Sequence, residues 1–270
     1  DKYTFDLFID FLKGRIRHPE RIITYFETLN ASDNIDDMNN LLKYILKKIQ
    51  DKSQKFGSLN DKLEEKIATL DLISHDTFFS YGAFGCAASH KAIWEESRRT
   101  KKEFLVFEDD CYTHPQIGEF IKDNSKTLKS CDICFFGLTT NSVVEVLSPQ
   151  GIQFSKIYFN PAYPNPDWIK NAFSKTSIKK IMFNKFLTGF GYWAYYVTPK
   201  GADKLIDLIF PLSLKTTKIP LIRSGQTADM PCISIDRAGC AVYKQIDALM
   251  TYPFLAYNQN TNKSTTHYLD

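Results

Sequence analysis

The stretch SHKAIWEESRRTKKEFLVFEDD, residues 89–110, decides the fold class of this chain. Residues 89–99 have the pattern of a helix, and residues 103–110 form an apolar β-type run that ends in three acids. Downstream, CDICFFGL at 131–138 predicts another buried strand, and GYWAYYVTPKGADKLIDLIF at 191–210 predicts a strand, a turn and a helix. Strands that alternate with helices predict an α/β fold with a mostly parallel sheet covered on both faces.

The flanking segments have a different texture. Residues 1–80 are predicted to be a helix-rich N-terminal part, because apolar residues recur at helical spacing in DDMNNLLKYILKKIQ at 36–50. Residues 81–270 then form the α/β core. Within this core, residues from about 148 to 186 are rich in Pro, Asn, Lys and aromatic residues, which predicts loops with a small hairpin.

Three consecutive acids, Glu108, Asp109 and Asp110, stand at the tip of the predicted strand. Ligands of open α/β sheets bind outside the carboxyl ends of strands. Clustered carboxylates repel one another unless a cation or hydrogen-bond donors compensate, and oxygen ligands suit Mg²⁺ or Mn²⁺ completed by substrate phosphates. The triplet therefore predicts a divalent-metal site for a phosphorylated substrate, with a solvated acidic turn as the alternative.

Composition says more about the cellular location of the protein than about its binding partner. With 34 basic and 31 acidic residues, the net charge of +3 gives no argument for nucleic acid, and we expect none as a partner. No window reaches the roughly 18 apolar residues of a membrane-spanning helix, and no secretory signal is visible. The expected location is cytoplasmic, which leaves contact with a membrane surface open.

Six cysteines are scattered through the chain, which is too large to need a disulfide framework. We therefore predict free thiols. Cys131 and Cys134 have metal or redox spacing, but they lie in an apolar run without a second Cys or His pair at zinc-site distance, so a structural role in a buried strand is favoured.

Several segments together resemble glycosyltransferase family 25, whose enzymes add galactose or related sugars to lipooligosaccharide or to collagen hydroxylysine. The resemblance rests on GCAASHKAIW at 85–94 followed by FLVFEDD at 104–110. It continues through GYWAYYVTPKGADKLI at 191–206, TADM at 227–230 and YPFLAYNQNTNKST at 252–265. Residues from about 80 to 265 are covered, whereas the first 80 residues match the family pattern poorly.

The resemblance implies a GT-A-like, Rossmann-type mixed sheet flanked by helices. It also implies a metal-dependent, inverting transfer of galactose or glucose from a UDP-sugar to an acceptor hydroxyl, such as that of a glycan. In such a site Asp110 would hold Mn²⁺ or Mg²⁺, with Glu108 as a further ligand. Asp109 and Glu108 would reach ribose, base or metal-bound water, and His267 near the end of the chain would complete the metal sphere.

An inverting displacement also needs a base within hydrogen-bond reach of the acceptor hydroxyl. Asp229 in RSGQTADMPC is the first candidate, with a helix N-cap as its alternative role, and Asp236 in SIDRAG is the second. Ser89 and His90 are predicted to lie at a helix start, where Ser89 caps the helix or either residue contacts phosphate or metal-bound water. A hydrogen-bonded structural histidine is the alternative for His90.

Aromatic residues offer two surfaces for a sugar. The run that contains Tyr192, Trp193, Tyr195 and Tyr196 could stack on sugar faces, although aromatic strands more often belong to a core. Trp168 and Tyr163, in the proline-rich segment, are the preferred candidates on the acceptor side.

Two other functions compete with a glycosyltransferase. A catalytically weak or inactive protein could bind a nucleotide sugar, or serve as an interaction module, on the same fold. A metal-dependent nuclease or phosphatase would use the same acids but normally needs further clustered His or Asp ligands. The acceptor, the choice of hexose and the oligomeric state have no readable pattern in the sequence, since epimeric sugars differ by one or two hydrogen bonds.

Overall fold

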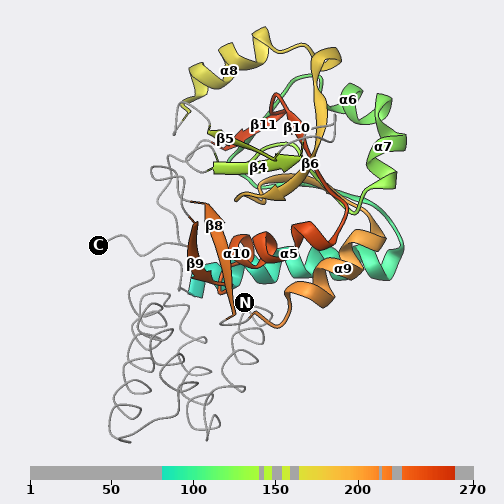
Figure 1. The fold of residues 1–270 in the computed structure, drawn as a ribbon. Coiled ribbons are helices and arrows are strands. Elements are labelled where there is room, and N and C mark those ends of the chain that lie inside the picture. The colour runs from blue at the N-terminus through green and yellow to red at the C-terminus, as the bar shows by residue number, and fades with distance from the viewer. Residues whose placement is uncertain are drawn as a thin grey trace, which may run out of the picture.

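A computed structural model describes residues 81–139, 143–147, 154–158, 164–212, 215–220 and 227–258. The predicted helix-rich segment 1–80 lies outside these residues. The described part is an α/β fold in which a mixed sheet lies between layers of helices (Figure 1), so the predicted fold class is confirmed.

Seven of the described strands form one sheet in the order β1-β7-β3-β10-β6-β4-β5. Their bounds are β1 Phe104–Phe107, β3 Ile133–Phe135, β4 Val143–Leu147, β5 Phe154–Tyr158, β6 Met182–Thr188, β7 Ala194–Val197 and β10 Ala248–Tyr252. Two ribbons complete the described strands: β2 (Cys111–Thr113) pairs with β11 (Ala256–Asn258), and β8 (Thr216–Pro220) pairs with β9 (Thr227–Pro231).

The expectation of a mostly parallel sheet is wrong. Among the pairings of the described sheet, only β3 with β10 is parallel, and the others are antiparallel. Strand β7 enters between β1 and β3 from the opposite end, after a loop in which Gly191 has a φ of 113°. Alternation of strands and helices does not fix strand direction, because a late strand can insert between two early ones.

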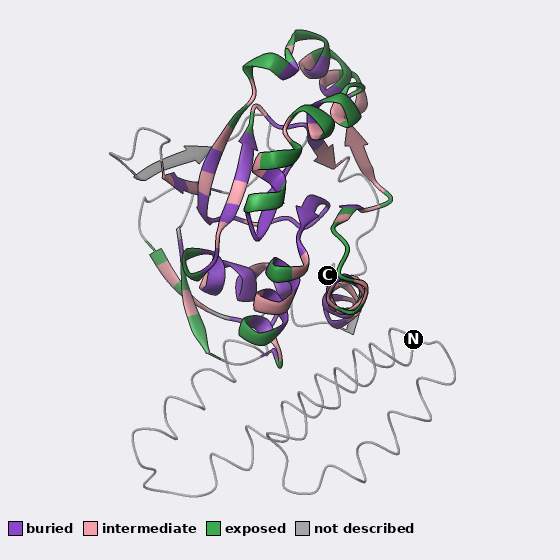
Figure 2. Cartoon of the chain, turned by 90° about the vertical axis from the view of Figure 1, so that its right-hand side faces the viewer, coloured by how far each residue is buried: buried purple, intermediate pink, exposed green. Residues whose placement is uncertain are grey.

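Helices cover both faces of the sheet. Buried residues of α5 (Tyr81–Thr100), α9 (Pro199–Ile209) and α10 (Ile235–Val242) belong to one apolar core, and those of α6 (Ile117–Asp123) and α7 (Ser125–Ser130) belong to a second. Strand β7 contributes to both, because Tyr195 faces the first core and Tyr196 the second. Figure 2 shows the buried strands between helices whose outward sides are exposed.

Helix α5 begins at Tyr81, eight residues before the predicted start at Ser89. The small residues that precede Ser89 form its first turns, in which Ala83, Ala87 and Ala88 are buried. Burial against the neighbouring helices overrides the low helix propensity of the glycines in this segment.

The segment expected to contain loops also contains a helix, α8 (Pro166–Lys175). Asn165 Oδ1 accepts a hydrogen bond of 2.9 Å from the backbone N–H of Trp168, and Pro166 occupies the first helical position. These are ordinary N-terminal signals of a helix, so this helix was predictable from the sequence. Strand β5 of this segment pairs in antiparallel register with β4, which lies just before it, so the hairpin expected within residues 148–186 stays a prediction.

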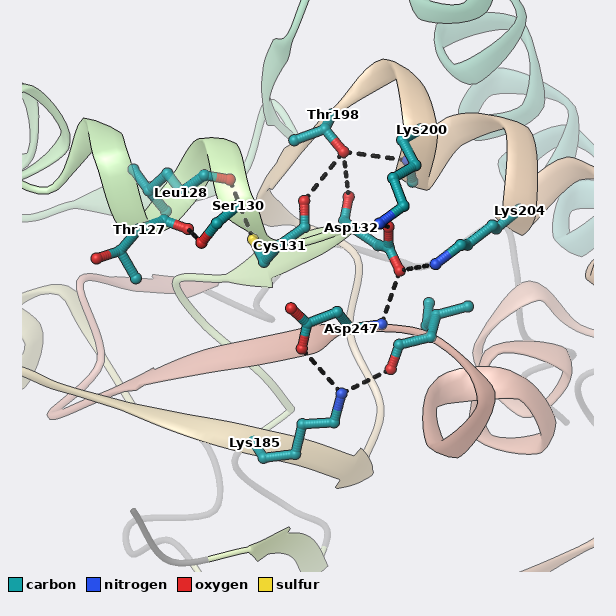
Figure 3. A network of polar contacts seen from close by, with 12 residues as sticks. Thr127, Leu128, Ser130, Cys131, Asp132, Lys185, Thr198, Lys200, Lys204 and Asp247 are labelled. Carbon is teal, nitrogen blue, oxygen red and sulfur yellow. Dashed lines mark hydrogen bonds and ion pairs between the residues drawn. The ribbon is translucent and has the colours of Figure 1, made fainter.

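A buried carboxylate joins α9 to the sheet (Figure 3). Asp132 is fully buried and accepts hydrogen bonds from Lys204 Nζ at 2.5 Å and from the backbone N–H of Asp247 at 2.7 Å. Lys200 Nζ lies 3.7 Å from the same carboxylate. A Cβ atom built at Gly201 would lie 1.8 Å from the Asp132 carbonyl oxygen, so only glycine permits this close approach of helix and strand.

All six cysteines are free, as predicted. Cys134 lies in the buried strand β3, and Cys131 Sγ donates to the Leu128 carbonyl at 3.2 Å. None of the described helices combines the length and the apolar character that crossing a membrane would need.

Candidate functional site

The acid triplet occupies the turn between β1 and β2, at the carboxyl end of β1, as the sequence predicted. The Glu108 backbone N–H donates to the Trp193 carbonyl at 2.8 Å, which fixes the start of the turn against the loop before β7. The Cys111 N–H closes the turn onto the Glu108 carbonyl at 3.2 Å. The three carboxylates therefore project from a backbone that the sheet itself holds in place.

Asp110 is the acid of the triplet whose carboxylate charge is least compensated by hydrogen-bond donors. Its Oδ1 atom is buried and has no hydrogen-bond partner. Burial raises the pKa of this carboxyl, and the charges of Glu108 and Asp109 raise it further. A buried carboxylate oxygen without a donor, next to two other acids, has the chemistry of a ligand for a hard divalent cation.

His90 faces the triplet from the middle of α5. It is 4% exposed, its Nε2 lies 3.4 Å from Glu108 Oε1, and its Nδ1 lies 2.9 Å from the Tyr195 hydroxyl. Ser89 does not cap a helix start, because its exposed hydroxyl donates to the Gly85 carbonyl at 3.0 Å within the helix. Only His90 of this predicted pair contacts an acid of the triplet in the described structure.

Cys86 was not among the predicted site residues. It lies one turn before His90, and the possible ligand atoms of Cys86, His90 and Glu108 all lie within 4.8 Å of one another. Burial raises the pKa of the Cys86 thiol, and the charges of Glu108 and Asp236 raise it further. A metal would thus have to displace the thiol proton. The spacing of four residues on one helix face is the signal that could have identified this neighbour.

Asp236 lies in the first turn of α10, where the sequence reading placed a second candidate base. Its Oδ1 accepts a hydrogen bond of 2.8 Å from the Gly191 N–H. Burial raises the pKa of the Asp236 carboxyl, and the charge of Glu108 raises it further. The hydrogen bond from the Gly191 N–H and the charge of His90 act in the opposite direction and lower this pKa. Asp236 therefore belongs to the same electrostatic neighbourhood as Glu108 and His90.

Asp229 lies in strand β9, so its alternative role as a helix N-cap is wrong. It is the cross-strand neighbour of Lys218, whose Nζ lies 3.8 Å from Asp229 Oδ2. The Asp229 side chain is 61% exposed, which leaves the carboxylate open to solvent.

The aromatic run around β7 belongs to the core. The side chains of Tyr192, Trp193, Tyr195 and Tyr196 are all buried, so they offer no open face on which a sugar could stack. Trp168 on α8 is half-buried, and its ring meets that of Tyr257 edge-on at 5.4 Å between centroids. Tyr163 and His267 lie outside the described residues, so they stay predictions.

Comparison with protein families gives a match that contains this site. The model of glycosyltransferase family 25 (LPS biosynthesis protein) matches residues 22–219, which include Cys86, His90 and the acid triplet. The match begins within the N-terminal segment that we expected to match poorly, and it ends before Asp229 and Asp236. No curated protein gives a significant match. The family match spans well over half of the sequence and contains the motifs at 85–94, 104–110 and 191–206, whereas those at 227–230 and 252–265 lie beyond it. The chain therefore belongs to glycosyltransferase family 25.

Proposed function

We propose that the chain is a metal-dependent, inverting glycosyltransferase of GT-A type that moves galactose or glucose from a UDP-sugar to a hydroxyl of a glycan acceptor. The observation that carries the proposal is the buried, unpartnered Oδ1 of Asp110 beside two further acids. Such a group is stabilised by a divalent cation, and a diphosphate is the usual completing ligand of Mg²⁺ or Mn²⁺.

Asp110 and Glu108 would hold the ion, with Asp109 directed to the nucleotide and His267 as a further proposed ligand. A bound Mn²⁺ or Mg²⁺ supplies Lewis-acid stabilisation of the negative charge on a departing UDP. The buried His90 contacts this site through Glu108, with 3.4 Å between His90 Nε2 and Glu108 Oε1.

The acceptor side needs a group that takes a proton. In an inverting transfer the acceptor oxygen bonds to the anomeric carbon while the bond from that carbon to the UDP oxygen breaks, and the hydroxyl proton goes to the base. We propose Asp229 as this base, because its carboxylate is exposed and an acceptor can reach it. Asp236 is the alternative, because it is coupled electrostatically to Glu108 and His90.

The first experiment measures UDP release from UDP-galactose and UDP-glucose, with and without Mn²⁺, in the presence of glycan acceptors. Metal-dependent release supports the proposal. Donor binding without turnover for any sugar would instead identify a nucleotide-sugar-binding protein. Phosphodiester or phosphomonoester cleavage would identify a metal-dependent hydrolase.

A second experiment separates the two proposed bases. Asp229→Asn should leave UDP-sugar affinity unchanged while transfer falls by roughly 100-fold or more, the scale of general-base catalysis. Asp236→Asn is the matched comparison, since it makes the same chemical change at the other candidate. If Asp229→Asn transfers within a few-fold of wild type and Asp236→Asn does not, then Asp236 is the base.

A further inference from the structure

Three buried side chains connect the core to Glu108. Trp94 Nε1 lies 3.1 Å from the Tyr195 hydroxyl, and the same hydroxyl lies 2.9 Å from His90 Nδ1. His90 Nε2 then faces Glu108 Oε1 at 3.4 Å. Trp94 and Tyr195 are 0% exposed and His90 is 4% exposed, so bulk water does not compete for the contacts among these three side chains. The Glu108 side chain, at the end of the chain of contacts, is 37% exposed.

The donors and acceptors fix the direction of this chain of contacts. An indole N–H can only donate, so the Tyr195 oxygen accepts from Trp94. The single hydroxyl hydrogen of Tyr195 is then available to His90 Nδ1, its other close polar neighbour. If Nδ1 carried the imidazole proton, the Tyr195 oxygen would accept from both Trp94 and His90. The hydroxyl hydrogen of Tyr195 would then have lost His90 Nδ1 as its acceptor, and a buried donor without an acceptor is unfavourable. A neutral His90 thus carries its proton on Nε2, which faces Glu108.

We propose that Trp94, Tyr195 and His90 form a one-way hydrogen-bond relay that presents the Nε2–H of His90 to Glu108 and orients this carboxylate for the reaction. The inference rests on the proposed function, in which Glu108 belongs to the metal and donor site. Tyr195 and His90 are then positioning residues that act through Glu108. The present 3.4 Å is longer than a charge-assisted hydrogen bond, and such contacts often tighten only when substrate is bound.

Two adjacent tyrosines provide a matched pair of variants. Tyr195→Phe removes the hydroxyl that contacts His90. Tyr192→Phe removes another buried hydroxyl of the same aromatic cluster; the Tyr192 ring lies 5.1 Å from that of His90, but its hydroxyl lies beside that of Tyr243 against Gly239. Loss of a buried hydroxyl is common to both variants, and loss of the relay is specific to Tyr195→Phe.

The direct test is the tautomer of His90, read from the ¹⁵N signals of the imidazole in the metal-free protein labelled at histidine. Subtraction of the spectrum of His90→Gln assigns the signals. Wild type and Tyr192→Phe should show a protonated Nε2 and an unprotonated Nδ1, whereas Tyr195→Phe should show a mixture of the two tautomers. A proton on Nδ1 in the wild type would overturn the proposal, even if Tyr195→Phe does not fold.

The kinetic test compares transfer rates. Tyr195→Phe should lower kcat by about 10-fold or more, the range seen when the partner that orients a metal-site ligand is removed, whereas Tyr192→Phe should stay within about twofold of wild type. His90→Gln keeps an N–H near the position of Nε2 and should retain more activity than His90→Leu. Equal rates for the two tyrosine variants, or for the two His90 variants, would contradict the relay.

The failures of this inference and of the proposed function are distinguishable. If no UDP-sugar is turned over, the function fails while the ¹⁵N spectrum still decides whether His90 presents Nε2–H to Glu108. If turnover is metal-dependent but His90 carries its proton on Nδ1, the function stands and the relay is wrong.

Discussion

Replacing Asp110 by Asn separates the proposed metal-binding role from the role of this residue in folding. The variant keeps the size of the side chain but removes one of three neighbouring negative charges, and the neighbours Glu108 and Asp109 disfavour that charge in the folded state. Interactions between partly exposed charges contribute up to about 1 kcal/mol. In the absence of metal, Asp110→Asn should therefore melt at the wild-type temperature or up to about 4 °C above it.

The addition of Mn²⁺ should reverse the order of stability. A ligand present at 100 times its Kd stabilises the folded state by about 2.7 kcal/mol, which corresponds to roughly 5–11 °C in a domain of this size. Wild type should gain this increment, and Asp110→Asn should lose most of it together with metal-dependent turnover, because the replacement amide is a weaker ligand without charge.

Scanning calorimetry with and without Mn²⁺ measures both effects, and titration calorimetry measures UDP-sugar binding. Asp123→Asn is the matched control, since it makes the same change at an exposed position at the end of α6 and should respond to Mn²⁺ like wild type. The reasoning is refuted if Asp110→Asn shows the full Mn²⁺ shift, or if it melts well below wild type without metal.

Three further predictions concern the scaffold. Asp132→Asn should lower the free energy of unfolding by about 2 kcal/mol at pH 7, because the buried carboxylate loses its charged hydrogen bond with Lys204. Burial opposes ionisation of Asp132, but hydrogen bonds from Lys204 and the Asp247 N–H leave the pKa of Asp132 below its usual range. The free energy of unfolding, measured by urea titration, should therefore be higher for wild type than for Asp132→Asn above about pH 4, and this difference should vanish as the pH falls further. Gly201→Ala should destabilise by about 3 kcal/mol or more in the same titrations, since its Cβ would meet the Asp132 carbonyl at 1.8 Å, whereas Gly118→Ala, with nothing within 4 Å, should be neutral or stabilising. Reducing agent should change neither the melting temperature nor the activity, because all six thiols are free; a large loss of stability would contradict this reading.

Local patterns predicted the elements that carry the acid triplet. The apolar run before Glu108 is a strand. The Pro-Lys-Gly sequence after β7, which was expected as a turn, forms the first turn of α9, and the N-cap Thr198 Oγ1 accepts from the Gly201 N–H at 3.1 Å. Such signals depend on residues a few positions apart, so a sequence displays them directly. Asn165 and Pro166 at the start of α8 are another local signal of this kind, and they predict a helix in the segment that was expected to contain loops.

Features that depend on distant residues were not predictable in this way. The contact of His90 with Tyr195 joins residues 105 positions apart, and the insertion of β7 between β1 and β3 depends on the register of two strand pairs. Asp229 illustrates the limit, because an Asp in TADM gives no local sign that its backbone pairs with Lys218 across a ribbon. Composition gave no sign either that the Asp236 carboxylate accepts a hydrogen bond from the distant Gly191 N–H.

In the described part of the chain, strand β7 lies between two apolar cores, and we expect these cores to differ in how readily they accept substitutions. Tyr195 and Val197 face the core of α5, α9 and α10, where His90 and Asp236 lie, whereas Ala194 and Tyr196 face the core of α6 and α7. A substitution that repacks the α6–α7 layer is therefore separated from the acid triplet's histidine by the thickness of the sheet. In a library of random mutants selected for activity, accepted replacements should accumulate first on α6 and α7, and the layer behind His90 should keep its sequence longest.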